Sequence, residues 1–598
     1  MKKWIAIILA GIMAFSLAAC SGSSGSSDEA ATSLAKIDNS KWLYNAAADV
    51  YYQTGISYCE TPADESYENL AVFVPGAYMD VTDNGDGTYT CELNDTAKVN
   101  GYTASTAPIV MPINTPGYSA QSALTDYTDV SEYMQAGFIY VHAGCRGRDE
   151  GAPAGVTDIK AAIRYIRYCD DELAGDAESI FTFGMSGGGA QSAVVGSTGD
   201  SELYNAYLEQ IGAVMETSDA VLGSMCWCPI TNLDTADEAY EWMLGSTRSG
   251  LSEDEQQISD KLAEAFAEYV NQAGFTDADG NKLTLETSGS GIYQSGSYYD
   301  YMKSIIEESL NNFLADTEFP YDADASSQGH MAGMGNGGGS GDGNRPDFGN
   351  GEKPDGMPRG EAPTGADDGS APDMENAESN DNISRNGSSG SGLSLSGTYE
   401  SAQDYIDALN MNGEWVTYDA DTNTATITSI ADYVSALKNA SKSLGAFDQL
   451  DSGQGENTLF GYGDGNGAHF DQTLAEILNE LGSNYTSAYE EDLEKTDSAG
   501  NTASTRLDMY TPLYYLLKSE DGYNTSAVAK YWRIRTGINQ SDCALSTEVD
   551  LALALEKCDQ VSDVDFETVW GQGHTMAERT GSSTENFITW INTCMGRI

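Results

Sequence analysis

The sequence predicts an α/β protein in which a mostly parallel sheet is flanked by helices and split by a long insertion. Three observations predict this class. Short apolar runs typical of buried strands alternate with helical periodicity between residues 70 and 194. The same alternation returns from about residue 528, and the composition between these parts is different. Strands that alternate with helices form parallel sheets through right-handed crossovers.

The first part of the predicted core contains four strands and a helix. The expected strands are 70–75, 107–112, 137–141 and 180–183, and the expected helix is 157–168, with one apolar face. The stretch from Trp42 up to the first strand is interpreted as helical. Residues 83–87 resemble a calcium loop but lack the acidic ladder and the closing Glu, so a hairpin turn is expected.

The insertion is predicted to be a mainly helical lid. Residues 230–320 are acidic with helical periodicity and a hairpin near 277–285, and a further strand is expected at 424–427. Residues 326–392 consist of Gly, Asp, Asn, Pro, Ser and Met with almost no aliphatic residue, which predicts a disordered, solvated segment.

The second part of the core is expected to contain strand 531–535, helix 544–555 and a last helix ending near Cys594. The predicted domains are therefore a core from 40–230 and 511–598, with a lid from 231–510.

Composition excludes several classes of function. The chain has 598 residues, with 92 acidic against 29 basic side chains and a formal net charge of −63. Such a chain lacks the clustered cations that nucleic acid requires, and it has no basic face for anionic lipid. No Cys or His group has zinc spacing, so neither a metal nor another cofactor is expected. The nine cysteines that follow Cys20 are interpreted as buried thiols.

The N-terminus has the features of a secretion signal. Lys2 and Lys3 precede an apolar run that is too short to span a membrane, and Leu17-Ala18-Ala19-Cys20 resembles the bacterial lipobox. We expect a signal peptide over 1–19, lipid on Cys20 and a flexible tether over 20–39. The chain would then be lipid-anchored to the outer face of the cytoplasmic membrane, at the bacterial cell surface. The alternative is an ordinary cleaved signal with a chance cysteine.

Gly184-Met185-Ser186-Gly187-Gly188 fits the G-x-S-x-G pattern of a nucleophile elbow. It follows a predicted strand and precedes the helix-like segment 190–194. The pattern predicts an α/β-hydrolase fold with Ser186 as nucleophile, and a Gly-rich structural turn is the alternative.

A serine nucleophile needs a general base, and the chain offers four histidines: His142, His330, His469 and His574. In α/β-hydrolases the histidine follows both the serine and the acid. His574 alone follows the returning α/β segment, so we predict it to be the base.

Asp542 is the predicted triad acid because it follows strand 531–535. A helix N-cap is its alternative role. Asp550, inside the next helix, and Asp565, on the following strand, are placed less well for this role.

The oxyanion hole is expected to use the N–H of Gly187 and one amide of loop 113–118. Pro116 has no N–H, which leaves Thr115, Gly117 or Tyr118. Gly117 is favoured.

Many motifs in this order resemble one family. They are Trp42, 72–75, 144–148, 158–165, the serine elbow, 228–230, 239–242, 446–451, 532–535 and His574. Together they resemble the bacterial (subtype B) tannases, α/β-hydrolases with a large lid that cleave galloyl esters. The resemblance covers most of the chain outside 1–40 and 322–396.

The resemblance implies that a lid lysine and a lid glutamate hold the phenolic ring, at Lys442 and Glu456. An ammonium can donate to ring oxygens and a carboxylate can accept from ring hydroxyls. The family also carries two acids spaced D-x-D, the first for the triad and the second for a ring hydroxyl. Here these positions are Gln540 and Asp542. We predict that the loop shifts so that Asp542 orients His574; the alternative is a weakened triad.

The predicted function is a surface-tethered serine esterase that acts, through an acyl-enzyme, on a small phenolic ester. No nucleic acid partner is expected, and the membrane is contacted only through the lipid anchor. The alternatives are a general carboxylesterase or feruloyl-type esterase, a non-catalytic substrate-binding lipoprotein, and a peptidase of similar fold.

Overall fold

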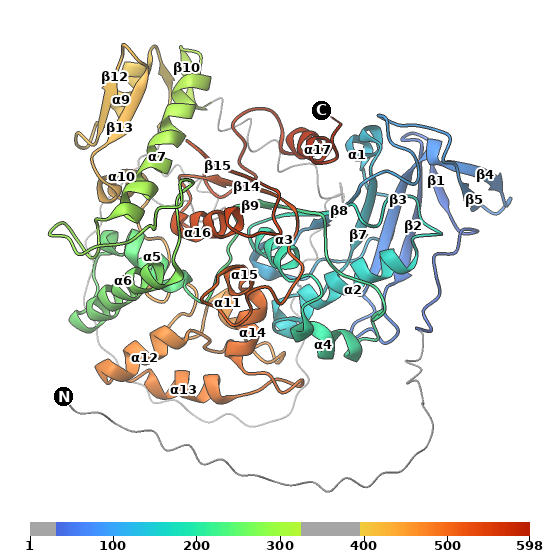
Figure 1. Ribbon diagram of the computed structural model, residues 1–598, viewed down its shortest axis with the longest axis horizontal. Coiled ribbons are helices and arrows are strands. Elements are labelled where there is room, and N and C mark those ends of the chain that lie inside the picture. Colours follow the sequence, from blue (N-terminus) through green and yellow to red (C-terminus); the bar gives the residue numbers. More distant parts are fainter. Residues whose placement is uncertain (1–31, 325–394, 598) are drawn as a thin grey trace, which may run out of the picture.

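A computed structural model describes residues 32–324 and 395–597. Its main sheet has nine strands in the order β1-β2-β3-β7-β6-β8-β9-β14-β15 (Figure 1). The strands are β1 (Leu43–Asn45), β2 (Val50–Ser57), β3 (Asn69–Pro75), β6 (Ile109–Ile113), β7 (Ile139–Ala143), β8 (Ile180–Met185), β9 (Gly223–Trp227), β14 (Tyr531–Gly537) and β15 (Asp563–Val569). The first four in sheet order, β1-β2-β3-β7, pair antiparallel, and β7 to β15 pair parallel.

Helices cover both faces of this sheet, as strand β8 demonstrates. Phe181 packs edge-to-face on Trp590 and Phe183 packs at a tilt on Phe587, both in the last helix, whereas Thr182 hydrogen-bonds Ser192 of the helix that follows the elbow. Alternate residues of a strand point to opposite faces. The core helices are α1 (Ser131–Ala136), α2 (Ala154–Tyr168), α3 (Gly187–Ser197), α4 (Asn205–Gln210), α16 (Leu545–Glu556) and α17 (Ser583–Cys594).

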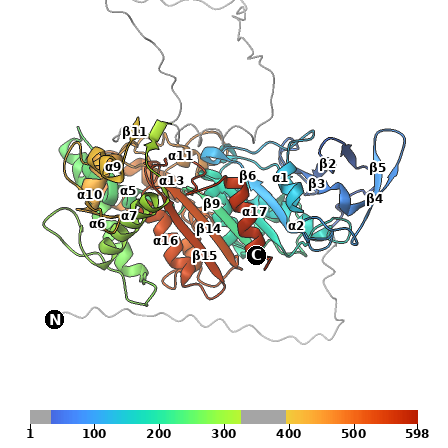
Figure 2. The ribbon, with the colours of Figure 1, turned by 90° about the horizontal axis from the view of Figure 1, so that it is seen from above.

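The chain leaves the sheet after β9 and returns at β14, and the intervening segment forms the lid. Figures 1 and 2 show much of it on the side of the molecule opposite the hairpin of β4 (Met79–Asp83) and β5 (Tyr89–Leu93). Its helices are α5 (Ala236–Leu244), α6 (Glu253–Ala273), α7 (Ser297–Asp316), α9 (Ala402–Leu409), α10 (Ile430–Leu437), α11 (Gly455–Leu459), α12 (Gln472–Leu481), α13 (Thr486–Glu494), α14 (Ala503–Tyr510) and α15 (Pro512–Leu516). Its short strands are β10 (Tyr321–Asp322), β11 (Thr398–Tyr399), β12 (Val416–Asp419) and β13 (Thr424–Ile427).

The lid and the sheet share one hydrophobic core. A single cluster of buried side chains includes Phe181 of β8, Phe266 of α6 and Phe447 of the lid loop. Burial of this extent fixes the lid against the sheet, because the apolar area would otherwise return to water.

Two parts of the sequence fold differently from expectation. The segment after Trp42, expected to be helical, forms strands β1 and β2, and the helix-favouring Ala46–Ala48 lie in the turn between them. Pairing of β2 with β3 overrides the local propensity. Strand β9 was not predicted. The expected hairpin at 83–87 is present as β4 (Met79–Asp83) and β5 (Tyr89–Leu93), which pair antiparallel.

Several sequence predictions fall outside the described residues. These are the signal peptide over 1–19, the lipidation of Cys20, most of the 20–39 tether and the 326–392 segment. Within the described ranges, no helix combines the length and hydropathy needed to cross a membrane, and no group of three or more metal-binding side chains is placed to hold an ion. The nine described cysteines are unpaired thiols, and all but Cys594 are buried.

Candidate active site

The nucleophile elbow lies between β8 and α3. Ser186 has a φ of 60°, and its N–H donates to the Trp227 carbonyl at 2.9 Å. A Cβ on Gly184 would lie 2.4 Å from the carbonyl oxygen of Gly188, and one on Gly188 would lie 2.1 Å from that of Ile113. Only glycine fits at these two positions, so the motif is required by the close approach of strand, turn and helix. Ser186 is 8% exposed at the N-terminus of α3.

The two predicted oxyanion segments meet beside this serine. A Cβ on Gly187 would lie 2.6 Å from both the Thr115 oxygen and the Tyr118 nitrogen, in the loop that follows β6. The Tyr118 N–H already donates to Thr115 at 2.9 Å. Gly117 adopts a φ of 56°, and its carbonyl accepts from Arg148 Nη1 at 2.9 Å. Arg148 thus holds the loop that carries the favoured second donor.

His574 follows β15 and is brought to the same edge of the sheet as Ser186. The thiol of Cys228 donates to the carbonyls of Gly573 and Thr575 at 3.9 and 3.2 Å, which ties the histidine loop to the end of β9. The preceding residue, Trp227, accepts from the Ser186 amide. The carboxyl ends of parallel strands meet at one edge, which is where α/β enzymes bind ligands.

The loop after β14 supplies two neighbours to the His574 ring. Gln540 Oε1 accepts from His574 Nδ1 at 2.7 Å, while Asp542 Oδ2 lies 3.9 Å from the same nitrogen. In this structure the hydrogen bond to Nδ1 is therefore made by Gln540. Asp542 remains at ion-pair distance, and the predicted shift that would bring its carboxylate into hydrogen-bond contact is not present. Its assignment as the triad acid stays a prediction.

Burial shifts the pKa of His574, the predicted base. It lowers the pKa of His574 below its usual 6.5, an effect that the carboxylate of Asp542 opposes and the cation of Lys442 reinforces. His574 is thus neutral at neutral pH, and a neutral imidazole can accept the proton of a serine hydroxyl.

The predicted lid pair lies over this site. Lys442 Nζ is 3.9 Å from Glu456 Oε1 and 3.7 Å from the ring centroid of Phe447, and the two charged side chains are 16% and 7% exposed. Glu456 lies in α11, which packs on the oxyanion loop; burial raises the pKa of Tyr118 in that loop, and the charge of Glu456 raises it further. Lys442 acts electrostatically on His574. The structure therefore brings Glu456 to the oxyanion loop and Lys442 within electrostatic reach of His574.

Sequence reasoning missed the residues that support the site. Gln540 contacts His574, and Glu548 contacts Gln540 from behind. Cys228 contacts the histidine loop, and Arg148 contacts the oxyanion loop. The sequence did contain a signal for Gln540, because this residue occupies the first acid position of the D-x-D pattern. Cys20, the predicted lipidation site, lies outside the described residues.

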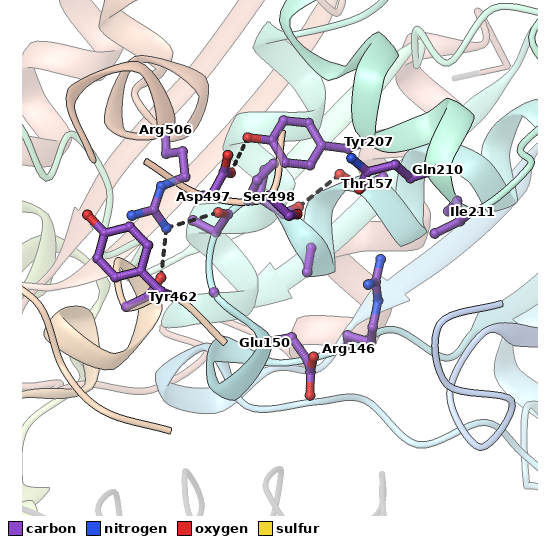
Figure 3. Close-up of a pocket in the computed structure, with 15 residues that line it drawn as sticks. Arg146, Glu150, Thr157, Tyr207, Gln210, Ile211, Tyr462, Asp497, Ser498 and Arg506 are labelled. Atoms are coloured by element: carbon purple, nitrogen blue, oxygen red, sulfur yellow. Dashed lines mark hydrogen bonds between the residues drawn. The ribbon is translucent and has the colours of Figure 1, made fainter. Parts of the chain in front are cut away.

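A separate pocket of about 130 Å³ lies between the core and the lid (Figure 3). Tyr207 donates to Asp497 at 2.5 Å on one side of it. On the other side Arg506 donates to the carbonyls of Phe460 and Gly461 at 2.7 and 2.8 Å. None of the predicted site residues lines this pocket.

Comparison with known proteins supports the fold. Residues 99–273, which include the elbow, match the BD-FAE family. None of the curated proteins compared with the chain matches it in sequence.

Solved bacterial tannases resemble the whole chain. The tannase of Fusobacterium nucleatum is 24% identical with a TM-score of 0.62, covering 95% of this chain and 98% of that one. The tannin acyl hydrolase of Lactobacillus plantarum is 24% identical with a TM-score of 0.60, covering 91% and 94%. A tannin acyl hydrolase solved in complex with 3,4-dihydroxybenzoate is 25% identical with a TM-score of 0.61, covering 93% and 96%. The resemblance noted in the sequence is thereby confirmed: the chain has an α/β-hydrolase fold with an inserted lid, of the form found in the bacterial tannases.

Proposed function

We propose that the protein is a serine esterase of tannase type that cleaves esters of phenolic acids. The observation that carries this proposal is the meeting of three features at one edge of the sheet: the Ser186 elbow, His574 on the loop tied to the end of β9, and the Lys442–Glu456 pair of the lid. The structural likeness to tannases, one of them solved with ethyl gallate, adds support.

The proposed reaction proceeds through an acyl-enzyme. His574 Nε2 takes the proton of Ser186 Oγ as the oxygen attacks the ester carbonyl, and the amides of Gly187 and Gly117 stabilise the oxyanion. Collapse of the tetrahedral intermediate breaks the ester C–O bond, and His574 gives its proton to the leaving alcohol. Water then attacks the acyl-serine, with His574 again as base, and releases the acid.

The lid pair is proposed to bind the phenolic ring of the acyl group. Lys442 can donate to ring oxygens, and the Glu456 carboxylate can accept from a ring hydroxyl. Burial strengthens these charge-assisted hydrogen bonds, because water competes poorly there.

The test is kcat/KM for methyl gallate, methyl 4-hydroxybenzoate and methyl benzoate. The wild type should prefer the hydroxylated rings, and Lys442→Ala and Glu456→Ala should each remove much of that preference, about 1–3 kcal/mol per lost contact. Ser186→Ala and His574→Ala should lower turnover about 10³-fold or more. Equal values for all three esters, unchanged by the lid variants, would favour the broader carboxylesterase instead.

A fluorophosphonate probe separates catalysis from binding alone. Labelling of the wild type but not of Ser186→Ala supports the serine esterase. A folded wild type that does not react would support a non-catalytic binding protein.

We also propose that the protein is a lipoprotein at the bacterial surface, on the evidence of the lipobox that ends at Cys20. Cys20→Ser should abolish incorporation of labelled fatty acid. Incorporation into the variant equal to that of the wild type would contradict the assignment.

A further inference from the structure

A chain of side chains leads from His574 into helix α16. Gln540 Oε1 accepts from His574 Nδ1 at 2.7 Å, and Gln540 Nε2 donates to Glu548 Oε1 at 2.5 Å. Gln540 Nε2 also donates to Thr536 Oγ1 at 2.8 Å, and that hydroxyl donates to Glu548 Oε1 at 2.8 Å. All three supporting side chains are buried.

The contacts on the far side of Gln540 decide which end of its amide faces the histidine. A carboxylate oxygen only accepts, and the single hydroxyl proton of Thr536 lies toward Glu548 Oε1 at 2.8 Å or toward Cys228 Sγ at 3.6 Å, in neither case toward Gln540. Both neighbours can therefore only accept from Gln540, so its NH₂ group must point to them and its oxygen to His574. An amide oxygen at Nδ1 requires a proton there, which leaves Nε2 free to accept from serine.

We propose that Glu548 is a positioning residue that holds Gln540 so that a neutral amide replaces the acid of the triad. The inference rests on the proposed esterase function and deepens it. A rotated amide would present N–H groups to Nδ1 and favour the wrong histidine tautomer, the same fault that an Asp-to-Asn change causes in a direct triad.

The surroundings of Glu548 match this role. The charged and titratable groups around Glu548 and Gln540 are Lys438 at the C-cap of α10, Tyr433, Cys228, Cys543, and, beyond the amide, His574 and Asp542. Lys438 Nζ is buried without a hydrogen-bond partner among the described residues, and its charge opposes that of Glu548.

Protonation of Glu548 leaves the orientation of Gln540 intact. Burial raises the pKa of Glu548 to about 7. Its Oε2 has no hydrogen-bond partner among the described residues, so it can carry the proton while Oε1 still accepts from Gln540. Below that pH the protonated carboxyl group of Glu548 no longer stabilises the imidazolium form of His574 electrostatically.

Asp542 has a different role from Gln540 and Glu548. Its carboxylate lies 3.9 Å from Nδ1, beyond hydrogen-bond distance, and it favours the charged histidine through space. It therefore does not select the tautomer.

The test exchanges the two groups. Glu548→Leu removes both oxygens that can accept from Gln540, and it should lower kcat on p-nitrophenyl acetate about 10- to 100-fold, a part of the roughly 10⁴-fold cost of a wrong tautomer, with KM little changed. The double variant Q540E/E548Q restores one carboxylate, one amide and their mutual hydrogen bond, and should return kcat to within about threefold of wild type. The acid limb of kcat/KM should then lie at higher pH, because a carboxylate against Nδ1 raises the pKa of His574.

Two controls separate the effect of the His574–Gln540–Glu548 hydrogen bonds from general effects on the fold. Asp550→Asn removes a buried carboxylate from the same helix and should keep wild-type kcat. Histidine ¹⁵N shifts in the Ser186→Ala protein report the tautomer of His574 without any turnover, and they should show Nδ1–H, lost in S186A/E548L but kept in S186A/D542N.

The outcomes are distinct. An unchanged tautomer in S186A/E548L overturns the inference, as does a loss of kcat that the double variant Q540E/E548Q fails to restore. A tautomer lost on Asp542→Asn instead would make Asp542 the orienting acid and also overturn it. A wild type that hydrolyses no ester would refute the proposed function. The ¹⁵N measurement would still show whether Glu548 and Gln540 set the tautomer of His574.

Discussion

Asp550 should make the free energy of unfolding fall as the pH rises. It lies in α16, 2% exposed, where its Oδ1 accepts from Tyr298 at 2.6 Å. Burial raises its pKa from 3.8 to about 8. A carboxyl group whose folded pKa is raised stabilises the fold fully below the unfolded pKa, and this contribution is lost as the pH rises through the folded pKa.

The magnitude follows from the width of that window. Between pH 3.8 and 8 the unfolded chain has released this proton and the folded chain has kept it, so stability falls by about 1.4 kcal/mol per pH unit at most. Asp550→Asn keeps an acceptor for Tyr298 and removes the titration. The variant should gain about 2–4 kcal/mol on the wild type between pH 5 and pH 8.

Urea unfolding of both proteins at pH 5, 6, 7 and 8 measures this difference. Asp559→Asn, an exposed aspartate just after α16, is the matched control for removing one negative charge from a chain of net charge −63. The reasoning is refuted if the stability gap between Asp550→Asn and the wild type is the same at pH 5 and pH 8, or if the control gains as much.

Three further changes test the site. Gly188→Ala should abolish activity and reduce the yield of folded protein, because its Cβ would lie 2.1 Å from the Ile113 oxygen; a folded, active variant in circular dichroism and ester assays would contradict this. Lys442→Met should move the acid limb of kcat/KM to higher pH, because the lysine charge lowers the pKa of His574; a superimposable pH profile would rule this out. Arg148→Ala should lower kcat on small esters about tenfold, because the guanidinium holds the oxyanion loop at 2.9 Å; an unchanged kcat would show that the loop keeps its conformation alone.

Most core strands and the nucleophile elbow could be predicted because their signals are local. The apolar run that becomes β8 and the glycines around Ser186 need no knowledge of the rest of the chain. His574 was proposed as the base by elimination, which was possible because the sequence has only four histidines. The lid residues Lys442 and Glu456 were reached by resemblance alone, since a single charge in a helical lid carries no signal of its own.

The support of His574 could not be predicted, because it depends on tertiary contacts. Gln540 is a neutral side chain, and the loop conformation decides whether it or Asp542 reaches the ring. Glu548 lies one helical turn into α16, where an acidic residue ordinarily serves the helix dipole. The strand at Val50–Ser57 was missed for the same reason, since its pairing partner lies outside the local window.

The insertion of the lid between β9 and β14 has a consequence for the order of synthesis. Gly223 pairs with Tyr531, so the last two strands of the sheet can dock only after the lid segment has been translated. Ser186 is made early, and its elbow can form from β8, α3 and the loop after β6. His574, its proposed base, is synthesised only after the lid, together with Gln540 and Glu548. A nascent chain therefore carries a serine without a base until the covering segment exists, and the proposed esterase becomes active only as a finished, covered site.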